Sequence, residues 1–400
     1  MNISNIVQEK QTDERTVVPG YFIREMTLDQ DLSGIVESWK QCNLKFSDHT
    51  IHCDPDWLQV HYKKQKHDVH IYLCQKNGNT VGAVPFHFTR QPLLCQLGDL
   101  IVAKFPLRVL RLQGYTPNLP EDESAYNLLF NSLLGAPFDA IFMNYVKEDS
   151  FFWHYLHTSP LIRKSFRYFS KRGPEPHLLA RLNGSFENYM QKFSAKTRKN
   201  RLREIKKLKD RGDMKFIRVT QESDVEAYLE AAMEISRKSW QFKRLGWGIS
   251  ASDPDGVRSE LNFLAQRGWL RSYLLKCGDV PCSFILGWQY GPRFYHAVVG
   301  FDPVWREFSV GSVLQMLVLE DLFKEDTPQV YDFGTFAEYK EYFSTESYRE
   351  DIVWLFRRRP YPLFADCMHR TFSAASRKSG ALLNRLGLKA KIKHFLRGRT

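Results

Sequence analysis

The run from Arg306 to Ser312 carries the residue types best suited to binding an anion. Arg306 lies in a predicted loop after the strand expected at Phe294–Val299, and Ser309-Val-Gly311-Ser312 opens a predicted helix. Backbone N–H groups at a helix start are unpaired, the helix dipole is positive there, and glycine leaves room for a pyrophosphate. The same residues also fit an ordinary Ser-capped helix with Gly311 needed for close packing. Both interpretations stay open.

A second candidate is the helix expected at about 194–210. Between residues 195 and 211 it holds nine Lys or Arg against Glu204 and Asp210. Leu202, Ile205 and Leu208 are expected to form one narrow apolar stripe, which leaves a wide basic face. That face is either a solvated surface or a binding site for an anionic substrate, for which arginine offers bidentate hydrogen bonds.

Two lobes of similar pattern position these candidates. Asn77-Gly78 lies between two apolar runs, which predicts a hairpin, and Tyr273–Leu286 predicts a second hairpin of the same kind. Each hairpin is followed by a strand, a helix and a buried strand, an order that favours a duplicated α/β unit. With 400 residues, two domains are expected. The predicted parts are a polar segment 1–20, an N-terminal lobe 21–176, a C-terminal lobe 177–356 and a basic tail 357–400.

The sequence predicts a cytoplasmic protein without a metal. Its seven cysteines are scattered without a C-x-x-C pair, and the histidines show no H-E-x-x-H motif. The N-terminus lacks the apolar region of a secretory signal, and no apolar run is long enough to cross a bilayer.

The tail is the other concentration of charge, with twelve Lys or Arg against Asp366 from residue 357 to 400. Short amphipathic pieces are expected around 381–386 and 388–396, separated by Gly387. A short basic amphipathic helix suits an anionic membrane surface, so 366–400 is a candidate for contact with the inner face of a membrane. A disordered solubilising tail is the alternative.

Six short motifs in a fixed order resemble the BioF2-like or CelD-like acetyltransferase family, which has the GNAT fold and is distantly related to the Fem aminoacyl transferases. The resemblance extends from about 182 to 356 and is weaker over 20–170. The motifs are Phe193-Ser-Ala-Lys-Thr-Arg-Lys-Asn-Arg-Leu-Arg203, Ser239-Trp-Gln241, Gly268-Trp-Leu-Arg271, Gly300-Phe-Asp-Pro303, Leu319-Glu-Asp-Leu-Phe323, and Tyr331-Asp-Phe-Gly334 followed by Tyr339-Lys340.

The resemblance implies two tandem GNAT-like lobes, each a mixed sheet flanked by helices, with an acyl-CoA site in the second lobe. The pantetheine would lie between diverging strands that end near Gly300 and Phe333. The residues implied in binding acetyl-CoA or another acyl-CoA are Gly300, Arg306, Ser309, Val310, Gly311 and Ser312. The phosphate loop departs from the family pattern, because one glycine is missing and Glu307 lies beside the expected anion.

Acyl transfer needs a base for the acceptor, a donor for the oxyanion and an acid for the leaving thiolate. Under the resemblance, the candidate bases are Asp302, Asp332 and His296. Tyr339 would protonate the thiolate, and Lys340 would contact an anionic substrate. Each also has a structural interpretation: Asp302 before Pro303 is a natural turn residue, Asp332 could cap a loop, and Tyr339 could simply be packed.

The residues expected to bind the acceptor are Lys196, Arg198, Lys199, Arg203, Trp240 and Lys340. The function predicted is therefore acyl-CoA-dependent acyl transfer to an amine or hydroxyl of a small anionic or sugar-linked acceptor, by resemblance in surface polysaccharide or cell-envelope synthesis. A Fem-like transferase that uses aminoacyl-tRNA and a non-catalytic scaffold with this fold are the alternatives. The oligomeric state is not predicted.

Overall fold

The computed structural model describes residues 20–46, 50–97, 100–170, 173–239, 249 and 253–385. The chain divides into two compact units, Met1–Gly173 together with Asp351–Thr400, and Pro174–Glu350. The strand β13 (Glu346–Arg357) contributes its first residues to the second unit and its last residues to the first unit.

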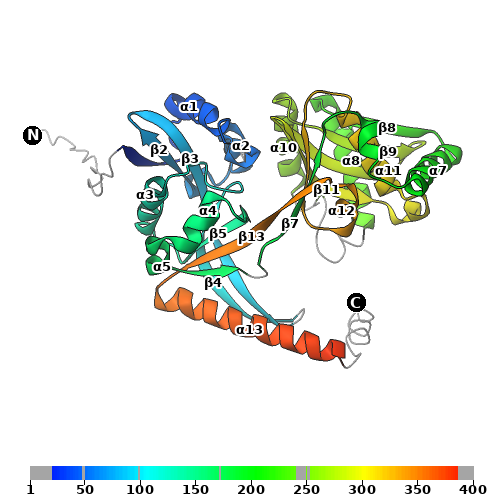
Figure 1. Cartoon of the computed structure of the whole chain (residues 1–400). Helices are drawn as coiled ribbons and strands as arrows, with labels where there is room; N and C mark the ends of the chain where they lie inside the picture. The colour runs from blue at the N-terminus through cyan, green and yellow to red at the C-terminus, as the bar shows by residue number, and fades with distance from the viewer. Residues whose placement is uncertain are drawn as a thin grey trace, which may run out of the picture. The chain divides into compact units, whose positions relative to one another are not determined.

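The first unit has a mixed sheet with helices (Figure 1). Four antiparallel neighbours, β1 to β4, are followed by β5, which pairs with β4 in parallel, and β6 pairs with the end of β13. The strands are β1 (Tyr21–Thr27), β2 (Val69–Lys76), β3 (Asn79–Leu97), β4 (Leu100–Leu112), β5 (Ala140–Lys147) and β6 (Phe166–Ser170). The helices are α1 (Ser33–Asn43), η1 (Ile51–Cys53), α2 (Pro55–His61), η2 (Lys66–Asp68), α3 (Glu123–Leu134), α4 (Phe151–Thr158), α5 (Pro160–Ser165) and α13 (Pro360–Arg385).

Local sequence explains the boundaries of several of these elements. Asn77 and Gly78 have φ of 52° and 80°, which is the left-handed backbone that a tight hairpin turn between β2 and β3 requires. Asp54 accepts hydrogen bonds from the amides of Asp56 and Trp57, and Pro55 occupies the first position of α2, as expected for a capped helix start.

The second unit is built on a seven-stranded sheet in the order β13-β7-β12-β11-β10-β9-β8. All neighbours are antiparallel except β11 and β12. Its strands are β7 (Glu175–Arg181), β8 (Met214–Val219), β9 (Ser272–Cys277), β10 (Val280–Tyr290), β11 (Arg293–Phe301) and β12 (Val330–Thr335). Its helices are α6 (Phe186–Met190), α7 (Ala195–Arg211), α8 (Glu222–Lys238), α10 (Pro254–Gln266), η3 (Pro303–Phe308), α11 (Val310–Leu322) and α12 (Glu338–Phe343).

The two units repeat one order of elements. In the first unit, β1, the α-helices α1 and α2, β2, β3, β4, α3 and β5 follow in this order along the chain, and in the described residues of the second unit β8, the α-helices α8 and α10, β9, β10, β11, α11 and β12 follow in the same order. In both, the last strand of this series pairs in parallel with the strand before the connecting helix. The repetition expected from the two hairpins is therefore present in the structure.

The C-terminal region differs from the expectation of two short amphipathic pieces. One helix, α13, begins at Pro360 and continues to Arg385, and residues 386–400 lie outside the described part of the chain. The first half of α13 is packed on the first unit, because the carboxylate of Asp366 is fully buried and pairs with Arg167 and Arg370. The helical C-terminal tail expected from the sequence is thus present, but the pattern did not show that its first half is packed, because its buried residues are small or polar.

Candidate active site in the second unit

A cavity of about 300 Å³ opens in the second unit beside the start of α11. It is lined by residues of β10, β11, η3, α11 and α12. All six residues predicted to bind the acyl donor line it, together with two of the predicted catalytic residues: Gly300, Arg306, Ser309, Val310, Gly311, Ser312, His296 and Tyr339.

The cavity lies where two parallel strands separate. β11 and β12 pair over only three residues, from Arg293 opposite Val330 to Tyr295 opposite Asp332, whereas β11 continues to Phe301. On its other side, β11 carries a bulge, because His296 and Val298 pair with adjacent residues of β10. Bulges re-aim side chains, and here the bulge follows His296 directly. The separation leaves an opening into which an extended chain can enter.

The start of α11 is open to the cavity. Ser309 adopts a left-handed conformation (φ 52°), and its side chain does not cap the helix. Among the described residues, the backbone amides of Val310 and Gly311 have no acceptor. A Cβ at Gly311 would lie 3.7 Å from Phe301, an ordinary contact, so close packing does not require this glycine. The arrangement suits an anion better than an ordinary Ser-capped helix.

The charges around this helix start also suit an anion. The Arg306 side chain lines the cavity, whereas the neighbouring Glu307 is exposed and does not line it. The corresponding helix of the first unit, α3, is different. The side chain of Asp122 accepts a hydrogen bond from the amide of Ser124 there, and Glu123 follows it. A carboxylate already occupies the α3 start, so of these two equivalent helices α11 is the one available to a phosphate.

Three side chains form a hydrogen-bonded chain at the inner end of the cavity. The Tyr331 hydroxyl donates to Oε1 of Gln315 (3.3 Å) and lies 2.6 Å from Nδ1 of His296. The roles at His296 depend on its tautomer: in the tautomer in which Tyr331 donates its hydrogen to Gln315, Nδ1 of His296 donates to Tyr331 and Nε2 keeps a lone pair. Burial, followed by the nearby Lys340 charge, lowers the pKa of His296 to about 3, so the ring is neutral.

Two polar atoms of this chain are left without a partner. Nε2 of His296 and Nε2 of Gln315 are buried and have no hydrogen-bond partner among the described residues, although both side chains line the cavity. Buried polar atoms without a partner are uncommon in folded proteins, and these two belong to side chains that a bound ligand would meet. Gln315 and Tyr331 were not predicted as site residues, because a glutamine in an apolar helix and a tyrosine in a buried strand look structural in sequence.

Tyr339, on α12, also lines the cavity and has its ring centroid 6.5 Å from that of His296. Burial raises the pKa of its phenol to about 12, although 45% of the residue remains exposed. The phenol is therefore protonated at neutral pH and can donate a proton or a hydrogen bond.

Asp332 belongs to a buried ionic cluster and does not line the cavity. Its carboxylate lies 2.6 Å from Nε2 of His177 and 2.9 Å from Arg293, and Nδ1 of His177 lies 2.6 Å from Glu350. Burial alone would lower the pKa of His177, but the two carboxylates outweigh it and raise the pKa to about 9. A doubly paired histidine and a paired arginine hold the Asp332 carboxylate, which fits a structural role at the junction of β7, β12 and β13.

Asp302 and Lys340 also lie outside the cavity lining. Asp302 caps η3 by accepting from the amide of Val304, and it pairs with Lys238 at 2.9 Å, which agrees with the turn interpretation. The Lys340 ammonium donates to the carbonyl oxygens of Phe333 (2.6 Å) and Thr335 (3.2 Å), and thus closes the end of β12.

The basic helix α7 packs beside η3, whose Arg306 lines the cavity. Of the predicted acceptor-binding residues, Lys196, Lys199 and Arg203 are exposed on α7, and Arg198 donates to the carbonyl oxygen of Phe193 (2.6 Å). None of the four lines the cavity. Trp240 lies outside the described residues.

The apolar stripe expected on α7 is only partly correct. Leu208 is fully buried and Ile205 is half-buried, but Leu202 is 68% exposed. The C-terminal half of α7 therefore packs on the second unit through this stripe, whereas its N-terminal half presents Leu202 to solvent.

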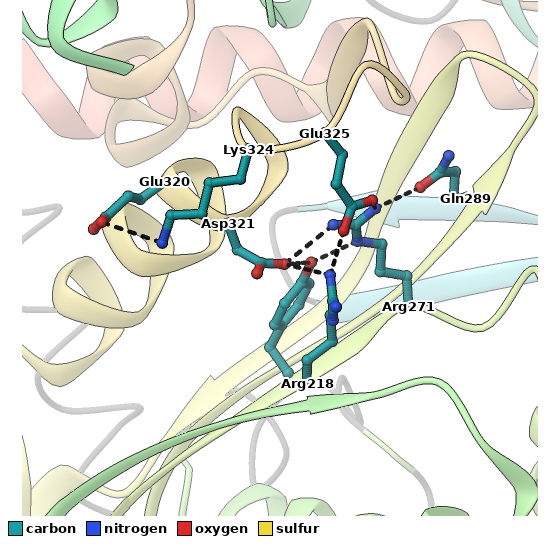
Figure 2. Close-up of polar contacts among 8 residues, drawn as sticks. Arg218, Arg271, Gln289, Glu320, Asp321, Lys324 and Glu325 are labelled. Carbon is teal, nitrogen blue, oxygen red and sulfur yellow. Dashed lines mark hydrogen bonds and ion pairs between the residues drawn. The ribbon is translucent and has the colours of Figure 1, made fainter. Parts of the chain in front are cut away.

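An ion-pair network fixes the far end of α11 (Figure 2). Arg271 contacts Asp321 at 3.1 Å and Glu325 at 2.7 Å, and Arg218 pairs with the same two carboxylates. The hydroxyl of Tyr273 also donates to Asp321 (2.9 Å). Acidic residues at a helix C-terminus oppose the helix dipole, so the two arginines compensate them and anchor α11 to β8 and to the start of β9.

A family model and several solved structures are similar to this chain. Residues 195–344 match a family model described as "Acetyltransferase (GNAT) domain". Among solved structures, FemX is similar with a TM-score of 0.59 and 11% identity, over 86% of this chain and 100% of that one. A conserved protein of unknown function from Bacteroides thetaiotaomicron has a TM-score of 0.48 and 9% identity, over 80% of this chain and 97% of its own.

A tandem GNAT protein from the clavulanic acid biosynthesis pathway has a TM-score of 0.46 and 8% identity, over 85% of this chain and 99% of its own. No curated protein sequence matches the chain.

The second unit is thus a GNAT-type acyltransferase domain. The predicted fold class, two tandem GNAT-like lobes with a helical C-terminal segment, is confirmed. Within the described residues, no helix is long and apolar enough to cross a membrane. Within the same residues, no group of three His, Cys, Asp or Glu side chains could hold a metal ion.

Proposed function

We propose that the second unit transfers an acyl group from acyl-CoA to an amine or hydroxyl of a small anionic or sugar-linked acceptor, in the synthesis of a surface polysaccharide or another cell-envelope component. The observation that carries the proposal is the cavity itself, in which a pair of separating parallel strands meets an uncapped helix start. The gap between the strands provides a path for an extended thioester arm, and the helix start provides amides for a diphosphate.

The residues that would hold the donor follow from the lining. The amides of Val310 and Gly311 and the side chain of Arg306 would bind the phosphates. The backbone of β11 beyond Tyr295 is not paired with β12, so it is available to hydrogen-bond an amide-containing arm. Acetyl-CoA and longer acyl-CoAs share these features, and the acyl chain is the part that the cavity would select.

The catalytic residues we propose are His296 and Tyr339. Nε2 of His296 takes the proton from the acceptor N–H or O–H as the acceptor forms its bond to the acyl carbon. The C–S bond breaks, and the Tyr339 phenol gives its proton to the departing thiolate; His296 then releases its proton and the exposed Tyr339 regains one through solvent before the next turnover. We assign Tyr331 and Gln315 as positioning residues, because Tyr331 lies 2.6 Å from Nδ1 of His296 and 3.3 Å from Gln315, and a hydrogen donated from Tyr331 to Gln315 would keep Nδ1 protonated and Nε2 free. We do not propose Asp302 and Asp332 as bases, because the carboxylates of both form ion pairs outside the cavity.

The acceptor would approach past η3 and α7, where exposed Lys196, Lys199 and Arg203 give a positive surface for a phosphate or sugar-phosphate group. Contact with an anionic surface was expected for 366–400. Because the first half of α13 is packed, we assign this contact to the residues beyond it. Contact with the inner face of a membrane would place the enzyme near lipid-linked acceptors.

The test is a calorimetric titration of the purified chain with CoA, acetyl-CoA and long-chain acyl-CoAs, paired with release of free thiol in the presence of candidate sugar-linked acceptors. Binding of acyl-CoA and thiol release that disappears in His296→Phe support the proposal. Absence of binding to every CoA species at millimolar concentration would indicate a scaffold that has lost the donor site. Co-purifying tRNA that high salt removes would instead indicate an aminoacyl-tRNA donor.

A further inference from the structure

The ribbon formed by β3 and β4 ends in an exposed apolar tip. Leu97 is 37% exposed, Leu100 68%, Ile101 42% and Val102 45%. Four large apolar residues gathered at the end of one ribbon exceed what scattered surface residues explain, and such a patch marks an interaction site.

The apolar residues cover both faces of the tip. Leu97 and Leu100 are paired across the ribbon and share one face, whereas Ile101, next to Leu100, points to the other face opposite Gln96. Val102 is the extra residue of a bulge just below them. A protein partner with a flat surface covers one face of a ribbon, but a fluid apolar medium covers both.

The surroundings of the tip are positive. Helix α13 runs along the ribbon toward the tip, since Tyr361 donates to the carbonyl oxygen of Pro106 (2.8 Å) and Nδ1 of His369 lies 3.0 Å from that of Leu94. Farther along the helix, Arg377 and Lys378 are exposed. The ribbon adds the exposed side chains Arg90 and Lys104, and the sequence from 88 to 112 holds four Lys or Arg against one acid, Asp99.

The charge of the C-terminal region favours an anionic lipid surface as the partner of the tip. Residues 360–400 contain nine Lys or Arg and one acid, Asp366, which is buried in an ion pair. A second copy of the chain would bring the same positive charge and be repelled, whereas anionic lipid headgroups attract basic segments that lie beside an inserted apolar side chain.

We propose that the β3–β4 tip inserts into the surface of an anionic bilayer while the basic end of α13 lies against the headgroups. Leu97, Leu100, Ile101 and Val102 enter the acyl region, and Lys104, Arg377 and Lys378 contact lipid phosphates. This inference concerns the first unit and does not depend on the proposed acyltransferase activity.

The experiment is co-sedimentation of the full chain with vesicles of phosphatidylcholine and phosphatidylglycerol (about 3:1) and of phosphatidylcholine alone. The chain should bind the anionic vesicles. The double variant Leu100→Ser with Ile101→Ser should bind them at least about tenfold more weakly, because it removes the inserted side chains and leaves every charge in place. The matched control is Val280→Ser, since Val280 is 47% exposed at a hairpin end of the second unit, and it should bind like the unchanged chain.

A second measurement keeps the test decisive if the basic tail alone gives some binding. The Leu100→Trp variant should show a blue-shifted emission on anionic vesicles and quenching by brominated acyl chains. Equal binding by the double variant, or an emission of the Leu100→Trp variant that vesicles leave unchanged, overturns the proposal. A dimer in light scattering that the double variant abolishes also overturns it, by showing a second copy on the tip. A blue-shifted emission of Leu100→Trp without vesicles would do the same, by showing that the chain's own C-terminal residues cover the tip.

Discussion

Replacing Gln315 by leucine tests whether the hydrogen-bonded side chains of His296, Tyr331 and Gln315 serve catalysis or stability. Gln315 is 3% exposed, its Oε1 accepts from Tyr331, and its Nε2 has no partner among the described residues. An unsatisfied buried donor costs about 1–3 kcal/mol, whereas a satisfied hydrogen bond contributes about 1 kcal/mol. Leucine removes both the unsatisfied amide nitrogen and the hydrogen bond from Tyr331, and the Tyr331 hydroxyl can then turn toward His296. The free energy of unfolding should therefore stay unchanged or rise by about 1 kcal/mol.

The effect on activity should have the opposite sign. Without Gln315 as acceptor, the Tyr331 hydrogen points to Nδ1 of His296, and Nε2 must carry the other proton and can no longer act as a base. We expect a loss in kcat of about 10²-fold or more, the range that general bases contribute, with little change in the affinity for acyl-CoA.

The assays are denaturant unfolding followed by tryptophan fluorescence and thiol release at saturating acyl-CoA. A matched control is Asn43→Leu in the first unit, whose amide is equally buried but satisfied, donating to Cys53 (2.7 Å) and accepting from Asn118 (3.0 Å). It should lower the stability of its unit by about 2 kcal/mol or more, because the amide of Asn118 and the carbonyl of Cys53 lose their partner. A Gln315→Leu chain that is destabilised by more than about 1 kcal/mol yet fully active would refute the reasoning.

Three further outcomes follow from the same geometry. The pKa of His177 is about 9 in the folded protein and about 6.5 when unfolded, so the folded state binds more protons between these values. The contribution of His177 to the free energy of unfolding, on the order of 3 kcal/mol, should be present below pH 6.5 and lost as the pH rises through 9. Urea unfolding of the second unit at several pH values measures this loss. Arg271→Met should destabilise the second unit by about 3 kcal/mol by leaving Asp321 and Glu325 less compensated; an unchanged urea midpoint would show that Arg218 suffices. His296→Phe should lower kcat by about 10²-fold to 10⁴-fold with a nearly unchanged melting temperature, and a fully active variant would remove His296 from the mechanism.

Periodicity and turn chemistry were enough to predict α7, the hairpin of β9 and β10, and the series β11, α11 and β12. Ser194 at the start of α7, the hairpin at Gly278 and the order of strand, helix and strand around α11 depend on local signals. The residues that line the cavity at the start of α11 could be predicted for the same reason, because a helix start is a local feature and Arg306 to Ser312 are consecutive.

The polar chain of the cavity could not be predicted in this way. His296, Gln315 and Tyr331 come from β11, α11 and β12, and only the parallel pairing of two strands separated by the helix brings them together. Asp332 was predicted as a candidate base, whereas its carboxylate forms ion pairs outside the cavity. Its partner His177 lies 155 positions earlier in the chain, so nothing local shows that the carboxylate is already paired.

A helical tail was predicted, but the packing of α13 on the first unit could not be, for another reason. A helix that packs on a ribbon through Ala365, Asp366 and His369 has no continuous apolar stripe, and its polar packed residues look like surface residues in the sequence. Their partners, Arg167 and the carbonyl of Leu94, lie on β6 and β3 and cannot be inferred from residues 357–400 alone.

The most direct test of the account is the placement of the donor diphosphate at the start of α11. Calorimetry should compare Gly311→Asp with Gly311→Ala for binding of acetyl-CoA and of S-acetylpantetheine, which lacks the diphosphate. Alanine fits beside Phe301 and leaves the amides open, so it should bind both ligands normally. Aspartate should weaken acetyl-CoA binding at least about tenfold and leave S-acetylpantetheine unchanged, since only the former brings phosphates to the new carboxylate. Equal affinity of Gly311→Asp and the unchanged chain for acetyl-CoA would contradict the account.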